Sequence, residues 1–322
     1  MKKILSLIVP MYNEEEVITK FFMRVFPILN GLPVDWEIIC INDGSHDGTL
    51  ELLYEWNRRN NKIRIINLSR NFGKECAVTA GLDFMSGDAV IPIDVDLQDP
   101  PEIIPEMVKL WLGGVDIVNA VREERDRDSF LKRTTSRWFY KTINAISDTP
   151  ILQDVGDYRL LSRRVSDVLR SMHERRRFMK GLFSWVGFSS TSIYYRRESR
   201  VAGTTKWNYW KLWNFAIEGI TSFSALPIKI ATYIGLAIAA ASFSYAIILI
   251  IDTLMFGNTV KGYPSLMTAM LFLGGMQLMF IGVVGEYISR IHEEVKGRPI
   301  YIVESSRGFE DVNHIAKHKY AG

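Results

Sequence analysis

Short apolar runs alternate with amphipathic stretches through the N-terminal third of the chain. The apolar runs predict β-strands at residues 4–10, 36–42, 63–68, 88–94 and 116–121. Between them, apolar positions recur at helical spacing near residues 14–29, 47–60, 74–86 and 101–112. This alternation predicts an α/β fold with a doubly wound, Rossmann-like, mainly parallel sheet and helices on both faces.

Two long apolar stretches follow in the C-terminal third. Formally charged residues are absent from Ile230 to Ile251 and again from Gly262 to Gly285. Each stretch exceeds the roughly 20 residues that cross a bilayer as a helix. We therefore expect a hairpin of two transmembrane helices, at about 228–251 and 263–285. A buried helical pair is the alternative, but core helices are rarely this long without a charge.

The segment before the first span, residues 207–224, is rich in Trp and Tyr. Such a composition favours an amphipathic helix in the membrane interface, with a core-facing helix as the alternative. The expected organisation is an α/β domain over 1–205, an interfacial helix over 206–226, a two-pass hairpin over 227–286 and a C-terminal tail over 287–322.

Charge around the spans predicts their orientation. The first apolar stretch is too short for a signal peptide, so the N-terminal region is expected in the cytosol. A single Lys lies between the spans, whereas six basic residues follow them, at Arg290, Lys296, Arg298, Arg307, Lys317 and Lys319. The positive-inside rule then predicts that both termini are cytoplasmic. Cys40 and Cys76 are expected to be reduced there.

Each of the five predicted strands is followed by a polar loop. In chain order these loops contain MYNEEE, NDGSHDGT, SRNFGKE, DVDLQDPPE and REERDRD. The carboxyl ends of parallel strands meet at one edge, where open α/β sheets bind ligands. The five loops therefore predict a binding site at that edge. Its acidic residues, the two spans and a net charge of only +3 exclude nucleic acid as a partner.

The fourth loop carries the strongest chemical signal. Asp94 and Asp96 alternate at the predicted strand end, so we expect both side chains on one face. Two carboxylates, with Gln98 as a neutral oxygen ligand, suit Mg²⁺ or Mn²⁺, and no neighbouring His or Cys favours zinc. A solvated turn is the alternative interpretation, and Asp99 is expected to belong to that turn.

The second loop places Asp43 at the end of its strand, where a carboxylate can accept hydrogen bonds from a ribose or a base. A helix-capping turn led by Ser45 and Asp47 is compatible with that role. The sequence contains neither the glycine fingerprint of dinucleotide-binding folds nor a P-loop. The five His residues show no metal-ligand spacing.

Together these loops resemble the inverting family 2 glycosyltransferases with the GT-A fold. The later segments QDVGDYRLLSRRV, FMKGLFSWVGF and RESRVAGTTKWNYWKL extend the likeness over nearly the whole chain. They are most similar to polyprenyl-phosphate sugar transferases, the dolichol-phosphate mannose synthases and especially the bactoprenol glucosyltransferases of O-antigen modification. Processive family members carry a Q-x-x-R-W motif; here Thr134 replaces its Gln and only two spans are expected, which favours single transfer.

The resemblance implies an inverting transfer of a sugar, with glucose from UDP-glucose favoured, onto undecaprenyl phosphate at the cytoplasmic membrane face. The β-linked product would serve O-antigen or other cell-surface glycans, with a downstream flippase and a glycan-modifying transferase as partners. Another sugar or lipid, and a membrane-anchored nucleotide-sugar-binding protein without turnover, remain alternatives. Self-association through residues 207–224 or the tail also remains open.

Site residues follow from the same resemblance. It implies that Asp94 and Asp96 act in catalysis and hold Mg²⁺ or Mn²⁺ with Gln98, Asp94 also contacting the donor diphosphate. Asp157 is expected as a base or acceptor-positioning group, with a structural Asp as the alternative. The implied nucleotide contacts are Pro10, Tyr12, Glu14 and Asp43. Acceptor-phosphate candidates, each alternatively a surface or headgroup contact, are Arg122, Arg133, Arg137, Arg200 and Lys206.

Overall fold

The computed structural model describes residues 2–122, 155–172, 174, 179–196 and 262–309, with isolated positions between 233 and 255. The chain divides into two units. The sheet unit comprises Met1–Ala145, Thr149–Trp213 and Pro299–Gly322, and the helical unit comprises Ile146–Asp148 and Asn214–Arg298.

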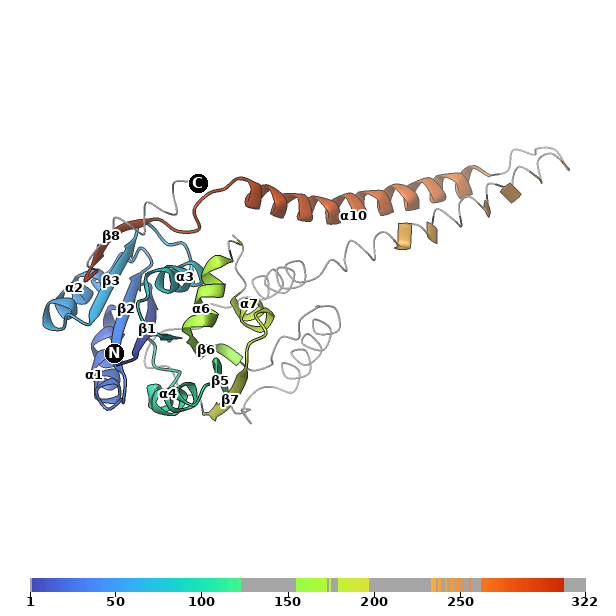
Figure 1. The fold of residues 1–322 in the computed structure, drawn as a ribbon. Coiled ribbons are helices and arrows are strands. Elements are labelled where there is room, and N and C mark those ends of the chain that lie inside the picture. The colour runs from blue at the N-terminus through green and yellow to red at the C-terminus, as the bar shows by residue number, and fades with distance from the viewer. Residues whose placement is uncertain are drawn as a thin grey trace. The chain divides into compact units, whose positions relative to one another are not determined.

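Within the sheet unit, the described residues form one eight-stranded sheet in the order β7-β5-β6-β4-β1-β2-β3-β8 (Figure 1). The strands are β1 (Ile4–Met11), β2 (Asp35–Asn42), β3 (Ile63–Leu68), β4 (Ala89–Pro92), β5 (Ile117–Arg122), β6 (Val155–Ser162), β7 (Ser190–Tyr195) and β8 (Val303–Arg307). The helices are α1 (Glu15–Asn30), α2 (Thr49–Arg59), α3 (Lys74–Phe84), the 3-10 helix η1 (Pro101–Ile103), α4 (Ile104–Leu112), α6 (Arg163–Ser171) and α7 (Met179–Trp185).

Strand direction confirms the expected common edge. β1 pairs in parallel with β2 and β4, and β2 pairs in parallel with β3. β6 is antiparallel to both β4 and β5, so β5 runs in the same direction as β4. The carboxyl ends of all five expected strands therefore meet at one edge, and the amino end of β6 joins them there. The two antiparallel strands, β6 and β8, were not predicted.

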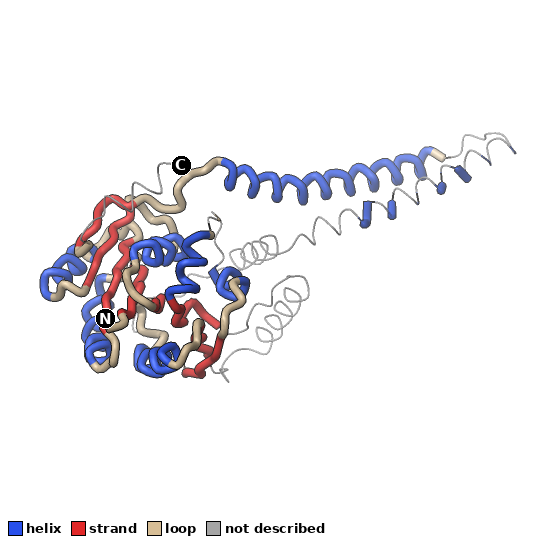
Figure 2. The backbone as a smooth tube through the Cα atoms, in the orientation of Figure 1, coloured by secondary structure: helices blue, strands red, loops and turns tan. Residues whose placement is uncertain are grey.

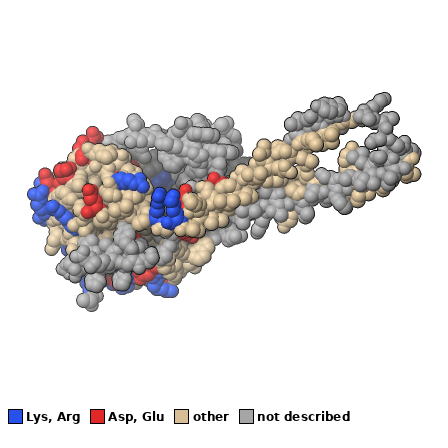
Figure 3. Space-filling model, turned by 90° about the horizontal axis from the view of Figure 1, so that it is seen from above, with Lys and Arg blue, Asp and Glu red and all other residues tan. Residues whose placement is uncertain are grey.

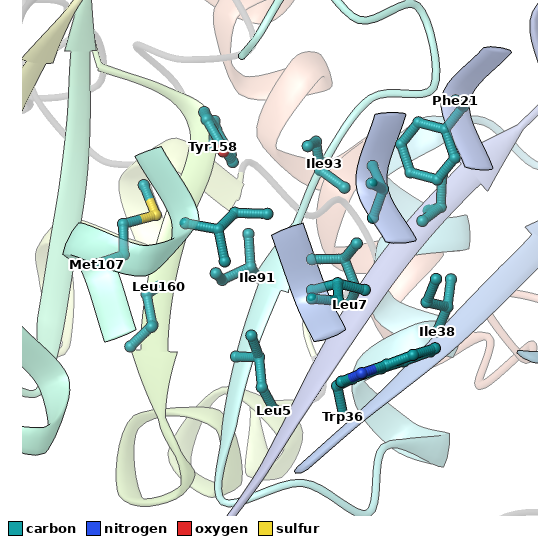
Figure 4. Close-up of a cluster of buried hydrophobic side chains, with 14 of the residues drawn as sticks. Leu5, Leu7, Phe21, Trp36, Ile38, Ile91, Ile93, Met107, Tyr158 and Leu160 are labelled. Atoms are coloured by element: carbon teal, nitrogen blue, oxygen red, sulfur yellow. The ribbon is translucent and has the colours of Figure 1, made fainter. Parts of the chain in front are cut away.

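Helices cover both faces of the sheet, as Figure 2 shows. On one face, Leu5 and Leu7 of β1 pack with Phe21 of α1 and Met107 of α4 (Figure 4). On the other face α3 lies so close that a Cβ at Gly81 would come within 2.4 Å of an Ile8 methyl group. Burying one large apolar side chain, such as Leu7 or Phe21, contributes about 1.5–3 kcal/mol to the stability of the fold. This two-sided core fixes the strand ends from which the polar loops emerge.

The C-terminal segment departs from the expected tail over 287–322. Residues 303–307 form β8, which pairs antiparallel with β3, and the Tyr301 hydroxyl donates to Asp83 Oδ2 at 2.7 Å. A five-residue strand with the sequence VESSR carries too little alternation to be recognised from its pattern. The chain after the helical unit thus returns to the edge of the sheet.

In the helical unit, α10 (Tyr263–Val295) has 33 residues and is about 50 Å long. Among the described residues, one segment is long and apolar enough to cross a membrane, Phe272–Val295, with a mean hydropathy of 1.3. The second expected span lies within α10, which continues past 285. The described atoms of this unit are mostly tan in Figure 3, whereas charged side chains are spread over the sheet unit. The interfacial segment 206–226, and all but isolated positions of the first expected span, lie outside the described residues.

Candidate functional site

A small cavity of about 60 Å³ opens at the edge where the strand ends meet. Pro10 of β1 lines it, together with residues from α3, the loop after β4, the end of β5 and the start of β6. Its charged lining residues are Lys74, Asp94, Asp99, Arg122 and Asp157. Side chains of both signs therefore converge from elements that are far apart in the sequence.

Lys74 connects two of the carboxylates. Its Nζ lies 2.7 Å from Asp94 Oδ1 and 3.0 Å from Asp157 Oδ2. Partial desolvation lowers the pKa of Lys74, but Asp94 and then Asp157 outweigh it, so the pKa lies above its ordinary value. A lysine at the first position of α3 faces the positive end of that helix, and the two carboxylates offset this repulsion. Lys74 thus ties α3, the β4 loop and β6 together.

The acidic loop after β4 differs from the strand end that its pattern predicted. The strand ends at Pro92, and Ile93 donates to the Ile8 carbonyl in a further sheet-like hydrogen bond. The chain then turns through Leu97, a non-glycine residue with φ of 56°, and Asp96 Oδ1 accepts from the Gln98 N–H at 3.1 Å. The strand therefore ends before Asp94, where the sequence predicted its end, and Asp94 and Asp96 both lie in the loop.

The oxygen donors of this loop nevertheless fit a hard divalent cation. The described residues hold no group of three or more His, Cys, Asp or Glu side chains arranged for a metal. Gln98 is 7% exposed, and its Oε1 lacks a hydrogen-bond partner among those residues. Mg²⁺ usually takes one or two carboxylates and completes its shell with water and substrate phosphates. Asp94, Asp96 and Gln98 supply that kind of donor set.

Asp99 is the clearest departure from its expected role as a turn residue. It is 4% exposed and accepts a hydrogen bond from the Tyr195 hydroxyl, with its Oδ1 3.7 Å from Arg122 Nη2. Arg122 itself ends β5 and lines the cavity. The pattern gave no sign of Tyr195, because the strand that carries it, β7, was not predicted.

The loops after β1, β2 and β3 form a separate wall beside the cavity. The Asn13 N–H donates to Ser45 Oγ at 2.9 Å, the His46 N–H donates to Asn13 Oδ1 at 2.8 Å and the Glu14 N–H donates to Thr49 Oγ1 at 2.9 Å. We call this set of three loops, residues 12–15, 43–49 and 69–73, the donor wall, after the nucleotide-sugar donor whose contacts are expected there. Tyr12, also in the wall, is 38% exposed.

Asp43 links the loop after β2 to the loop after β3 within the donor wall. Its Oδ1 accepts from the Phe72 N–H at 2.7 Å and its Oδ2 accepts from the Gly73 N–H at 2.9 Å. Burial raises the pKa of Asp43, although these two N–H donors oppose the shift. Asp43 is only 3% exposed, and its two hydrogen bonds tether the loop after β3. The ribose or base contact expected of Asp43 stays a prediction. Gly44 (φ 66°) lies so close to this loop that a Cβ would come within 2.4 Å of the Arg70 carbonyl carbon.

The structure thus separates the expected site residues into groups. Cavity-lining residues are Pro10, Asp94, Arg122 and Asp157. The acidic turn holds Asp96 and Gln98, and the donor wall holds Tyr12, Glu14 and Asp43. The remaining candidates lie outside the described residues, namely Arg133, Arg137, Arg200 and Lys206.

Sequence reasoning missed Lys74, Asp99 and Tyr195. Lys74 did leave a signal, since a lysine at the start of a predicted helix opposes the helix dipole and calls for a carboxylate nearby. Asp99 and Tyr195 left none, because their contact joins residues 96 positions apart in the chain.

Comparison with known proteins identifies the architecture. The family model described as glycosyl transferase family 2 matches residues 6–170. The chain belongs to this family. A second model, the GtrB C-terminal hairpin, matches residues 226–291. The resemblance inferred from the loop motifs is confirmed, and with it the assignment of the chain as a glycosyltransferase.

Named relatives match almost end to end. The SfII prophage-derived bactoprenol glucosyl transferase of Shigella flexneri is 52% identical over 302 residues, which is 94% of this chain and 98% of the relative. A prophage bactoprenol glucosyl transferase homolog of Escherichia coli K12 is 50% identical, covering 93% of this chain and 98% of its own. An uncharacterized glycosyltransferase of Synechocystis is 51% identical over 95% of this chain and 96% of its own.

Proposed function

We propose that this family 2 glycosyltransferase moves glucose from UDP-glucose to undecaprenyl phosphate, inverting the anomeric carbon to give a β-linked lipid-phosphate sugar. About 50% identity to relatives named bactoprenol glucosyl transferases, over 94% of the chain, supports the donor sugar and the acceptor lipid. Supply of this lipid-linked glucose to O-antigen or another cell-surface glycan is part of the proposal.

One structural observation carries the proposal. The cavity places the carboxylates of Asp94 and Asp157 beside the cations Lys74 and Arg122. A transfer between two phosphate-bearing substrates needs both kinds of charge: carboxylates for a cation on the leaving diphosphate, and fixed cations for the attacking phosphate. Arg122 suits the latter because its planar guanidinium binds phosphate oxygens bidentately.

The chemistry asks little of a general base. A lipid monophosphate has a second pKa of roughly 6 and is already anionic at neutral pH. In our proposal Asp94, Asp96 and Gln98 hold Mg²⁺ or Mn²⁺, and such an ion stabilises the charge that develops on the departing diphosphate. Asp157, held by Lys74 at 3.0 Å, then serves to orient the acceptor beside the anomeric carbon. In-line attack inverts an α-linked donor to a β-linked product.

We further propose that the sheet unit works at the cytoplasmic face of the bacterial inner membrane. The candidate span in α10 and the hairpin family match over residues 226–291 support a two-pass anchor. The basic residues that follow the spans support cytoplasmic termini by the positive-inside rule. A membrane-embedded acceptor makes such an anchor useful, because the phosphate headgroup lies at the bilayer surface.

The test incubates membranes containing the full chain with undecaprenyl phosphate and a panel of radiolabelled nucleotide sugars, with Mg²⁺ or Mn²⁺. We expect labelled lipid with UDP-glucose, and released UDP in equal amount. Label with a different sugar would reassign the donor, and absence of label with every donor would overturn the proposal. Binding of UDP-glucose without release of UDP would indicate a non-catalytic binding protein instead.

An Asp94→Asn variant provides the residue-level control. It keeps the volume of the side chain and removes its charge, and we expect loss of about 10³-fold in transfer because an electrostatic contact of the reacting groups disappears. Asp167→Asn, the same change at an exposed α6 residue paired with Arg163 and Arg170, should transfer at the wild-type rate. A folded Asp94→Asn protein with wild-type activity would contradict the site.

A further inference from the structure

The side chain of Arg122 is held in place by contacts that no sequence motif indicated. Arg122 and Tyr195 are direct cross-strand partners at the last residues of the parallel strands β5 and β7. The Arg122 Nε–H donates to the Tyr195 hydroxyl oxygen at 3.2 Å. The guanidinium is therefore held by a residue on the neighbouring strand.

Asp99 completes this support from a third element. The Tyr195 hydroxyl donates to Asp99 Oδ1 at 2.5 Å, and Arg122 Nη2 lies 3.7 Å from the same oxygen. Asp99 and Tyr195 are each 4% exposed, so this carboxylate is a buried charge that needs partners. The hydroxyl and the guanidinium provide them, which makes the three side chains one interdependent unit.

The surroundings restrict where the unit can move. The Tyr158 ring packs edge-on against the Tyr195 ring with centroids 6.0 Å apart, and the Tyr158 hydroxyl donates to the Pro100 carbonyl at 2.9 Å. On the cavity side, Gly156 leaves room for the guanidinium, because a Cβ there would lie 3.3 Å from Arg122 Nη2. The Arg122 side chain is 35% exposed and lines the cavity with Lys74 and Asp94.

We propose that Tyr195 and Asp99 are positioning residues that hold the Arg122 guanidinium in the cavity to bind a substrate phosphate. A guanidinium has five N–H donors, so the bonds that fix its orientation leave others for phosphate oxygens. Fixing it in advance removes the cost of ordering a long side chain when the substrate binds. This inference rests on the proposed function, and it assigns a role to two residues that do not themselves touch the substrate.

The protonation states agree with this arrangement. Burial, and then the charge of Asp99, raises the pKa of Tyr195, so the hydroxyl keeps the proton that it donates. Desolvation lowers the pKa of Arg122, but its hydrogen bond to Tyr195 and the negative charges of Asp99 and Asp94 more than compensate, and the guanidinium stays charged.

Tyr195→Phe tests the proposal, and Tyr194→Phe is the matched control because Tyr194 is the adjacent β7 residue and is 69% exposed. KM is measured separately for undecaprenyl phosphate and for UDP-glucose in both variants. We expect Tyr195→Phe to raise the KM for undecaprenyl phosphate about tenfold, the effect of losing one hydrogen bond to a charged group. Tyr194→Phe should leave both constants unchanged. A rise confined to the UDP-glucose KM would assign the bound phosphate to the donor.

A double-mutant cycle separates positioning from a general structural effect. Arg122→Lys removes the planar guanidinium that Tyr195 holds. In that background, adding Tyr195→Phe should therefore raise the KM for undecaprenyl phosphate by less than twofold. Asp99→Asn is the second single variant, and it should also raise the KM for undecaprenyl phosphate. It replaces Tyr195→Phe as the test if thermal melting shows that Tyr195→Phe folds poorly.

The outcomes distinguish this inference from the proposed function. If wild-type protein makes no lipid-linked sugar, the proposed function fails. If wild-type protein is active and folded Tyr195→Phe and Asp99→Asn proteins match it in both KM values, the positioning role is wrong. The same conclusion follows if Tyr195→Phe raises the KM for undecaprenyl phosphate by the same factor in the Arg122→Lys background as in the wild type.

Discussion

The two halves of the functional edge are built differently. The donor wall, made by the loops after β1, β2 and β3, is joined by hydrogen bonds to backbone N–H groups, with Asp43 tying two of its loops together. The cavity beside it, made by the carboxyl ends of β4 and β5 and the start of β6, is held by contacts between charged side chains, Lys74 with Asp94 and Asp157 foremost.

This difference suggests different tasks. The Asp43 carboxylate already accepts hydrogen bonds from two backbone N–H groups. The donor wall therefore keeps its shape and offers a preformed binding surface. Charges that compensate one another across a cavity can exchange partners when a charged substrate or cation enters. We therefore expect changes in the cavity to alter transfer strongly, and changes in the donor wall to alter donor affinity or stability more modestly.

After Asp94→Asn, the largest effect should come from Lys74→Met, which removes the cation between Asp94 and Asp157. We expect transfer to fall roughly 100-fold, comparable to the loss of one electrostatic contact in an active site. In the absence of nucleotide, the affinity for Mn²⁺ should rise about tenfold, because a positive charge paired with Asp94 opposes the binding of a second one. Electron paramagnetic resonance of Mn²⁺ measures the affinity independently of activity.

Lys62→Met is the matched control for that variant. Lys62 also pairs with an aspartate, Asp35, but at the opposite end of β2. It should change neither transfer nor Mn²⁺ affinity. If Lys74→Met bound Mn²⁺ no better than Lys62→Met, the view of Lys74 as a cation that competes for Asp94 would be wrong.

An intermediate effect is expected where the C-terminal strand supports the donor wall. Asn67 Nδ2 donates to Glu304 Oε2 at 2.8 Å, and Asn42 Nδ2 donates to Asn67 Oδ1 at 2.7 Å, next to Asp43. Glu304→Ala should raise the KM for UDP-glucose about threefold to tenfold, the range expected for one hydrogen bond to a charged group. The KM for the lipid acceptor should not change.

Ser306→Ala, on the same strand, controls for a general loss of β8. If both variants raised the donor KM equally, the effect would belong to the strand and not to the Glu304 contact. Equal donor KM values in Glu304→Ala and wild type would remove the link between β8 and the donor wall.

The smallest effect should come from Asp47, near the start of α2. Although desolvation raises the pKa of Asp47, hydrogen bonds from Thr49 and the Glu15 N–H outweigh it, so the pKa lies below its ordinary value. A lowered pKa means that its carboxylate stabilises the fold above the unfolded pKa near 3.8 and that this contribution is lost as pH falls through the folded value.

We expect Asp47→Asn to lower the free energy of unfolding at pH 7 by about 0.3–1 kcal/mol, the usual size of a charge interaction at a helix N-terminus. Urea unfolding at pH 7 and at pH 3 measures it, and the difference from wild type should shrink at the lower pH. A deficit that is equal at both values would show that the charge of Asp47 is not involved.

Much of the sheet could be predicted because its signals are local. The strand around Leu5 and Leu7 and the helix around Phe21 follow from the spacing of apolar residues over a few turns of chain. Parallel pairing then placed five polar loops at one edge, including those of Asp94 and Arg122. That reasoning needed only direction and periodicity, which each segment carries in its own sequence.

Errors arose where a residue's position depends on elements distant in the sequence. Asp94 was expected to end a strand, with Asp96 just beyond it, but that strand ends at Pro92. The hydrogen bonds that Asp43 accepts from the loop after β3 could likewise not be predicted from its own segment, and its nucleotide contact stays a prediction. In both cases the local pattern indicated the residue type but not the contacts that distant segments of the chain make with it.

The sequence by itself determined the alternation of strands and helices, the family, and an edge rich in carboxylates and cations. Only the tertiary structure decided which charges meet. The antiparallel β6 between β4 and β5 brings Asp157 to Lys74, and the pairing of β7 with β5 brings Tyr195 to Arg122 and Asp99. Periodicity reports which face a side chain occupies, whereas contacts between residues far apart in the chain depend on strand order, which no single segment encodes.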